Sequence, residues 1–190
     1  GVIDRIRYAF AADSAATEKA IAENSTDVVW RSLAPAALER LGGEMAAGGN
    51  RTRTGFTRVP LPNVRVQRLV VSPSSAYRDN PAVRGALAAA LQADRTLASI
   101  VPPDVAGSVA AFPLGGTVEV PNLGAQRLRL TLAYDSRAPG ERDLAGLLRD
   151  RLEERAGMSV QLLPDAVDAD LLLTDRPAWV NTAFGWLQPY

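Results

Sequence analysis

The sequence contains no histidine and no cysteine. Histidine is the side chain most often used as a general acid or base near neutral pH, so its absence excludes Ser-His-Asp and Cys-His catalytic arrangements within this chain. The absence of cysteine excludes thiol chemistry and most structural zinc sites. We therefore expect a protein that binds a ligand rather than an enzyme, with no cofactor and no metal.

The sequence also has very little lysine and no net charge. Of the 21 cationic residues, only Lys19 is a lysine, and 21 acidic residues bring the formal net charge to zero. A chain without an excess of positive charge has no long-range field that attracts polyanions. We therefore expect no nucleic acid among its partners.

The sequence has no apolar run approaching the 18 residues that a transmembrane helix needs, and no charged leader before an apolar stretch. Instead, an alternating apolar pattern begins at once, and the last residues are again apolar. We expect that the chain is a fragment of a longer exported protein.

What is present is a composition typical of folded domains, with 47% hydrophobic and 22% charged residues among 190. A chain of this length buries about two thirds of the surface that it exposes when unfolded, so one sizeable core is expected. We therefore predict a single α/β lobe over residues 1–190.

The first third of the chain has the pattern strand, helix, strand, helix. Residues 2–11 alternate as in a strand, residues 14–22 favour a helix, residues 26–30 are short and β-branched, and residues 35–45 return to helix. Strands separated by helices usually pair in parallel through right-handed crossovers. The pattern therefore predicts parallel pairing.

The remainder continues the same alternation around an irregular centre. Residues 101–124 are rich in proline and glycine yet apolar, which predicts irregular structure packed against a surface. Around this stretch, periodicity and capping residues predict further elements. The predicted strands are 55–61, 64–72, 126–134, 158–163 and 169–174, and the predicted helices are 80–94 and 139–156. Together these elements predict a mixed, mostly parallel sheet with helices on both faces.

Polar and aromatic side chains follow three of the predicted strands. In an open α/β sheet the ligand crevice lies beyond the carboxyl ends of the strands, so these side chains are cleft candidates, although core packing or an interface explains the tryptophans equally well. The candidates are Trp30, Arg31, Ser72, Ser74, Tyr77, Asp175, Arg176 and Trp179. Acidic residues are common in turns, so Asp165 and Asp168 are interpreted as structural.

Several segments, taken in order, resemble a known family. Residues 26–29 read TDVV, residues 80–95 read NPAVRGALAAALQADR, a Leu-rich strand ends at Tyr134, a long helix closes with Ala156 and Gly157, and residues 169–174 read ADLLLT. In this order they resemble the C-terminal lobe of the family 5 extracytoplasmic solute-binding proteins. The resemblance implies a periplasmic-binding-protein-like lobe that belongs to a two-lobed protein.

The resemblance also implies a function. Family members bind solutes, dipeptides, oligopeptides or nickel among them, for ABC importers, so the expected partners are a small solute, a peptide or a glycolipid headgroup, and a membrane permease. The expected location is the cell envelope, through a lipid anchor outside this sequence. Peptide-binding members place an Asp shortly after the last strand to hold the ligand amine, whereas this chain has Asp175, Arg176 and Trp179 there. This departure argues against a standard peptide binder.

A second interpretation remains open. The Ala- and Arg-rich sequence is similar to actinobacterial lipoproteins of this family, including the LpqW type, which are implicated in phosphatidylinositol mannoside and lipoarabinomannan assembly. On that interpretation the chain keeps the binding-protein fold but acts as a regulatory or scaffold protein that contacts a membrane-bound envelope enzyme. Its signature would be a shallow or filled cleft together with an exposed apolar patch to which Phe112 and Leu114 contribute.

Overall fold

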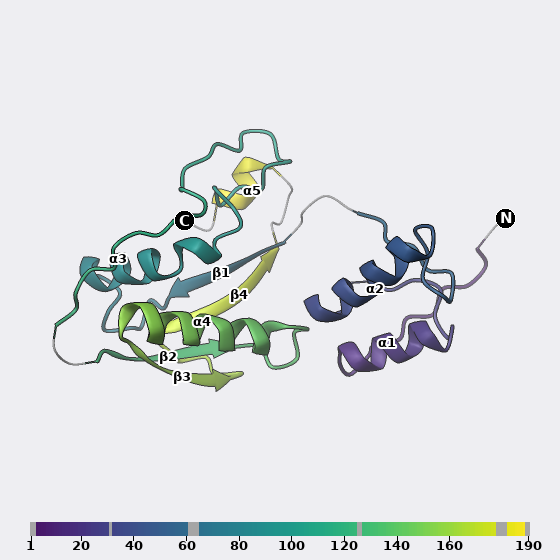
Figure 1. Cartoon of the computed structure of the whole chain (residues 1–190), viewed down its shortest axis with the longest axis horizontal. Coiled ribbons are helices and arrows are strands. Elements are labelled where there is room, and N and C mark those ends of the chain that lie inside the picture. The colour runs from purple at the N-terminus through teal and green to yellow at the C-terminus, as the bar shows by residue number, and fades with distance from the viewer. Residues whose placement is uncertain (1–2, 31, 61–64, 125–126, 178–181, 189–190) are drawn as a thin grey trace. The chain divides into compact units, whose positions relative to one another are not determined.

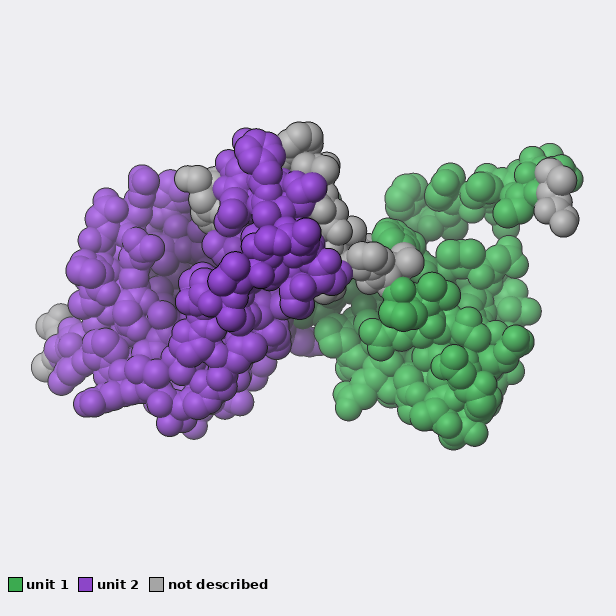
Figure 2. Space-filling model, turned by 90° about the horizontal axis from the view of Figure 1, so that it is seen from above, with its two compact units in different colours: residues 1–60, 137–140 green, residues 61–136, 141–190 purple. Residues whose placement is uncertain are grey.

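The computed structural model describes residues 3–30, 32–60, 65–124, 127–177 and 182–188. The side chains of Arg65, Arg176 and Pro177 are also outside the description. The chain divides into two compact units, whereas one lobe was expected over its whole length. Unit 1 comprises residues 1–60 and 137–140, and unit 2 comprises residues 61–136 and 141–190 (Figure 2).

Unit 1 is built on two helices, α1 (Ser14–Ala22) and α2 (Pro35–Ala47). Asp13 caps α1, because its Oδ1 accepts the Ala16 backbone N–H at 2.8 Å. Both helices were predicted, α2 ending two residues later than expected.

The strands predicted for unit 1 are wrong. Within the described residues, the segments 3–11, 26–30 and 55–60 form no strand. A strand is stable only when its N–H and C=O groups pair with a neighbouring strand, and unit 1 has none among its described residues. Alternation of apolar and polar residues along one segment was therefore not enough to form a strand.

Unit 2 contains a four-stranded sheet in the order β1-β4-β2-β3 (Figure 1). Its strands are β1 (Arg65–Val71), β2 (Arg129–Tyr134), β3 (Ser159–Pro164) and β4 (Leu171–Pro177). β2 pairs in parallel with both β3 and β4, whereas β1 pairs antiparallel with β4. The predicted fold class is confirmed: the chain is α/β with a mixed, mostly parallel sheet.

Two helices cover one face of this sheet. α3 (Pro81–Ala90) and α4 (Glu141–Ala156) pack against each other and share a core with the sheet. Asn80 Oδ1 caps α3 by accepting two backbone N–H groups. Gly157 follows α4 with a φ of +60°, the left-handed conformation that favours glycine at a helix end. Both helices were predicted, but α3 ends four residues before its predicted end at Asp94, and α4 begins two residues after its predicted start at Pro139.

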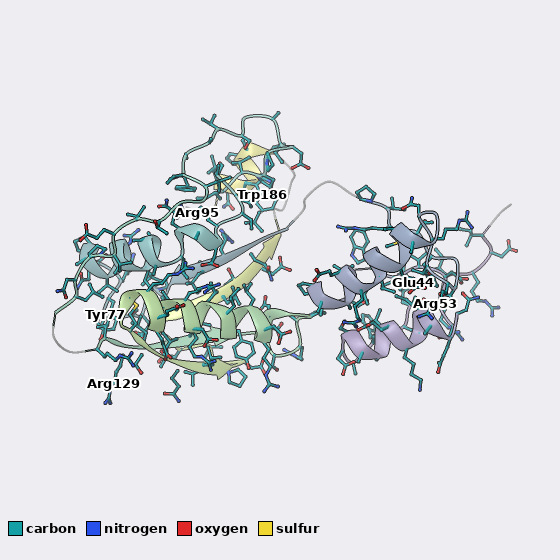
Figure 3. All side chains as sticks on the ribbon, in the orientation of Figure 1. Glu44, Arg53, Tyr77, Arg95, Arg129 and Trp186 are labelled. Carbon is teal, nitrogen blue, oxygen red and sulfur yellow. The ribbon has the colours of Figure 1, made fainter. Side chains whose placement is uncertain are left out.

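A short helix lies on the opposite side of β1. Side chains alternate along a strand, so Val66 points away from the face to which Leu69 and Val71 contribute. Val66 packs in a separate cluster with Trp186 of α5 (Ala183–Leu187), a helix that was not predicted (Figure 3). The short 3-10 helix η1 (Gln92–Asp94) follows α3, and residues 101–124 are irregular as predicted.

Candidate functional site

The carboxyl ends of β2, β3 and β4 meet at one edge of the sheet, because these strands run in parallel. We name this the carboxyl edge. β2 is followed there by Asp135 and Ser136, β3 by Asp165, and β4 carries Asp175 near its end. Open α/β sheets bind ligands in this position, so this edge is the candidate site.

Glu141 is the most buried carboxylate at the carboxyl edge. It is the first residue of α4, only 3% of it is exposed, and its Oε2 accepts the backbone N–H of Asp135 at 3.0 Å. Burial raises the pKa of Glu141, and the nearby charges of Asp135 and Asp175 raise it further, while the hydrogen bond from Asp135 opposes the shift. Three carboxylates therefore interact at this edge.

Asp165 holds the turn after β3 to the end of β2. Its Oδ1 accepts the Ser136 backbone N–H at 2.9 Å, and its Oδ2 accepts the Ser136 hydroxyl at 2.6 Å. Its backbone is left-handed, with a φ of +56°, which aspartate tolerates better than most residues. Asp165 is thus engaged in structure, in agreement with its interpretation from the sequence.

The residues predicted to line one cleft are not brought together. Ser72, Ser74 and Tyr77 follow β1, which runs antiparallel to β4, so they lie at the opposite edge of the sheet from Asp175. Val71 is opposite Leu171 in the register, four residues from Asp175, or about 13 Å along the strand. The prediction was wrong because it assumed that β1 runs in the same direction as β4.

Ser72 and Ser74 instead belong to a structural network at that opposite edge. Ser72 is buried, its hydroxyl lies 2.8 Å from that of Ser74, and Ser74 donates to Asp168 at 3.1 Å. Asp170 accepts hydrogen bonds from Ser75 at 2.8 Å and from Thr131 at 2.9 and 3.0 Å. The network ties the segment after β1 to β2 and to the start of β4.

The remaining predicted residues are dispersed or undescribed. Tyr77 packs against the core of unit 2 (Figure 3), and Trp30 is in unit 1, where it is 60% exposed. Arg176 pairs with Val66 through the backbone of β4, but its side chain lies outside the description. Arg31 and Trp179 lie outside the described residues. Among the predicted cleft residues whose side chains the structure describes, only Asp175 lies at the carboxyl edge.

Sequence reasoning missed Asp135, Ser136 and Glu141. The signal for the first two was available, because they directly follow the strand predicted over residues 126–134. Glu141 carried no signal, since its burial depends on how the start of α4 meets the end of β2. The hydrogen bond from the Asp135 N–H to Glu141 joins the end of β2 to the start of α4, and no periodic pattern in the sequence predicts such a contact.

A groove of about 410 Å³ lies elsewhere in unit 2, where residues 120–124, 127 and 128 line one side and residues 155–157 line the other. Leu123 and Leu128 contribute apolar lining, and Arg127 and Arg155 contribute charge. Arg155 is held by Asp94 at 3.0 Å and by the Ala90 carbonyl at 2.9 Å. The groove is lined by residues that precede β2 and by the end of α4, so it is distinct from the carboxyl edge.

The raised pKa of Glu141 predicts a pH dependence of stability. As the pH rises through the window above the ordinary pKa of 4.5, the unfolded chain releases this proton first, so the free energy of unfolding falls. Glu141→Gln keeps an acceptor for the Asp135 N–H but cannot ionise. We expect the variant to gain stability relative to the parent between about pH 4 and pH 7, as urea denaturation would measure. A difference that stays constant with pH would contradict the assignment.

Two comparisons, with family models and with curated proteins, find no match to this chain. Within the described residues, no group of three acidic, histidine or cysteine side chains is placed to hold a metal ion. None of the described helices combines the length and apolar character needed to cross a bilayer.

Proposed function

We propose that this chain is a ligand-binding, non-catalytic unit of an extracytoplasmic solute-binding protein of the kind that serves ABC importers. The observation that carries the proposal is the carboxyl edge, where three parallel strands of an open sheet present polar side chains. The ligand would be enclosed when a second lobe closes over this edge by a hinge motion, and a membrane permease would receive it.

The order of elements in unit 2 supports the proposal. α3 begins directly after Asn80, β2 ends at Tyr134, α4 closes at Ala156 before Gly157, and β4 follows Asp170. These are the segments that carry the resemblance to family 5 solute-binding proteins. The segments of unit 2 form the expected helices and strands, which supports the proposal, whereas residues 26–29, which also carry the resemblance, form no strand.

The charges at the carboxyl edge indicate what kind of ligand group it would contact. Asp135 is exposed, Asp175 is half-buried, and both interact with the buried Glu141. Carboxylates accept hydrogen bonds from ammonium groups and from hydroxyl groups, and charged acceptors form the stronger bonds. The described carboxylates of this edge are therefore suited to an amine or a sugar hydroxyl.

Isothermal titration of the full two-lobed protein tests the proposal, using three ligand classes: short peptides, oligosaccharides and glycolipid headgroups. We expect one class to bind, and we expect Asp175→Asn to weaken that binding about tenfold or more, because a hydrogen bond to a charged acceptor is lost. Asp143→Asn is the matched control, since Asp143 is an exposed carboxylate in the first turn of α4. It should change affinity less than about twofold. Absence of binding across all three classes would exclude the proposal.

A second candidate function is regulation of an envelope enzyme that assembles glycolipids. The observation in its favour is a group of exposed apolar side chains in an irregular segment of unit 2: Val109, Phe112, Leu114 and Val118. These four side chains lie within ten residues of one another in the sequence, and exposed apolar side chains that gather on a surface favour a protein contact. A pull-down from envelope membranes, with this protein as bait and the Leu114→Asp variant as control, would distinguish the two functions. Recovery of transporter subunits alone would contradict a regulatory function.

A further inference from the structure

Unit 1 leaves most of its large apolar side chains in solvent. Among its described residues only Ile21, Ala37 and Met45 form a buried apolar core. A unit of about 60 residues is marginal even with a full core. The exposed set is larger than the buried one: Ile3, Ile6, Tyr8, Phe10, Val28, Trp30, Leu38 and Val59. The surface of unit 1 therefore has the composition of one that another surface covers.

Residues 5–10 of segment 3–11 follow the period of a β-strand, whereas Ile3 and Asp4 before them do not fit the alternation. Ile6, Tyr8 and Phe10 are 66%, 82% and 98% exposed, and they alternate with Arg5 and Arg7. In an extended conformation they form an apolar face and a basic face. Within the described residues, the backbone of this segment makes no hydrogen bond, so its N–H and C=O groups are available for pairing.

A second segment of the same kind follows α1. Residues 26–30 expose Val28 and Trp30, at 79% and 60%. The order along the chain is extended segment, α1, extended segment, α2, which is the order of two parallel strands joined by a crossover helix. Both segments thus have strand composition, and neither has a strand partner among the described residues.

We propose that residues 3–11 add as a β-strand to the open edge of a sheet in a partner, and that residues 26–30 extend the same sheet. The partner edge that fits carries acidic side chains on one face and apolar side chains on the other. Arg5 and Arg7 would then face carboxylates across the strands, while Ile6, Tyr8 and Phe10 would join an apolar layer. Main-chain pairing supplies affinity in this mode of recognition, and the alternating side chains supply specificity.

A second copy of this chain does not provide such an edge. Across strands β1 to β4 the only acidic residue is Asp175, and β1 itself contains arginine. Pairing Arg5 and Arg7 with these strands would leave them without opposite charges, or place them opposite like charges, which is destabilising. The partner is therefore a different sheet. This inference does not depend on ligand binding at the carboxyl edge.

Two synthetic β-hairpins test the proposal against the full chain. Each has an Asn-Gly turn and an exposed edge strand, in which valine alternates with glutamate in one hairpin and with lysine in the other. We expect the glutamate hairpin to protect the amides of residues 3–11 from hydrogen exchange and to bind about tenfold more tightly than the lysine hairpin. Arg5→Glu combined with Arg7→Glu should reverse this preference.

The matched control is Arg51→Glu combined with Arg58→Glu, which changes the charge of unit 1 equally at exposed positions outside both segments. This control should keep the preference for the glutamate hairpin. Failure of both hairpins to protect residues 3–11, or equal protection by both, overturns the proposal. Protection that increases with protein concentration in the absence of peptide also overturns it, because a second copy is then the partner.

Discussion

Replacing Leu152 with alanine is expected to lower the free energy of unfolding of unit 2 by about 3 to 4 kcal/mol. Leu152 is fully buried in α4, within the core that α3 and α4 share with the sheet. The substitution removes three carbon atoms and leaves a cavity that the surrounding strands cannot fill without shifting. Alanine is an excellent helix former, so the loss reports packing and not helix propensity. Urea denaturation followed by circular dichroism would measure it.

Leu147→Ala is the matched control for this prediction, since it makes the same chemical change in the same helix. Leu147 is 42% exposed, and we expect its replacement to cost less than about 1 kcal/mol. Equal losses at Leu147 and Leu152 would mean that α4 does not bury the face described above.

Asp170→Ala is expected to cost about 3 kcal/mol, nearly as much as the loss of a core leucine. The Asp170 carboxylate accepts hydrogen bonds from the Ser75 hydroxyl and from both the backbone N–H and the hydroxyl of Thr131. Its removal leaves the Thr131 N–H, a partly buried donor in the central strand β2, without this acceptor. Breaking a hydrogen-bonded network by removing its acceptor costs more than the average hydrogen bond.

Asp168→Ala provides the comparison for Asp170, because the two aspartates are two residues apart but differently engaged. Asp168 accepts one hydrogen bond, from Ser74 at 3.1 Å, at an exposed position. We expect a loss below about 1 kcal/mol for Asp168→Ala in the same denaturation experiment. If Asp168→Ala proves as destabilising as Asp170→Ala, the network does not centre on Asp170.

Local signals were sufficient for the helices. The Asp13 and Asn80 caps, the proline at the start of α2 and of α3, and the glycine after α4 act within one turn of the helix, so they can be read from neighbouring residues. The four strands of unit 2 were also predicted, with shifts of up to three residues at their ends, because each has alternating or consecutive apolar residues over a short length. α5 was missed because five residues carry too little periodicity to be recognised.

The candidate site was predicted only in part. The structure places Asp175, a predicted cleft residue, near the end of β4, the strand that reaches the carboxyl edge. Ser72 and Ser74 were assigned to the same cleft, yet they belong to the opposite edge because β1 is antiparallel to β4. Strand direction depends on the path of the chain between β1 and β4, about one hundred residues of it, and no local pattern encodes that path.

Composition and periodicity alone determined that this chain lacks histidine and cysteine chemistry, that helices and strands follow one another in unit 2, and where most helices begin and end. These properties depend on single residues or on neighbours within one or two turns. Tertiary structure decided which strands pair, in which direction, and therefore which polar side chains meet at the carboxyl edge. It also decided that residues 3–11 and 26–30 form no strand within this chain, because a strand requires a partner for its backbone groups and local sequence cannot supply one.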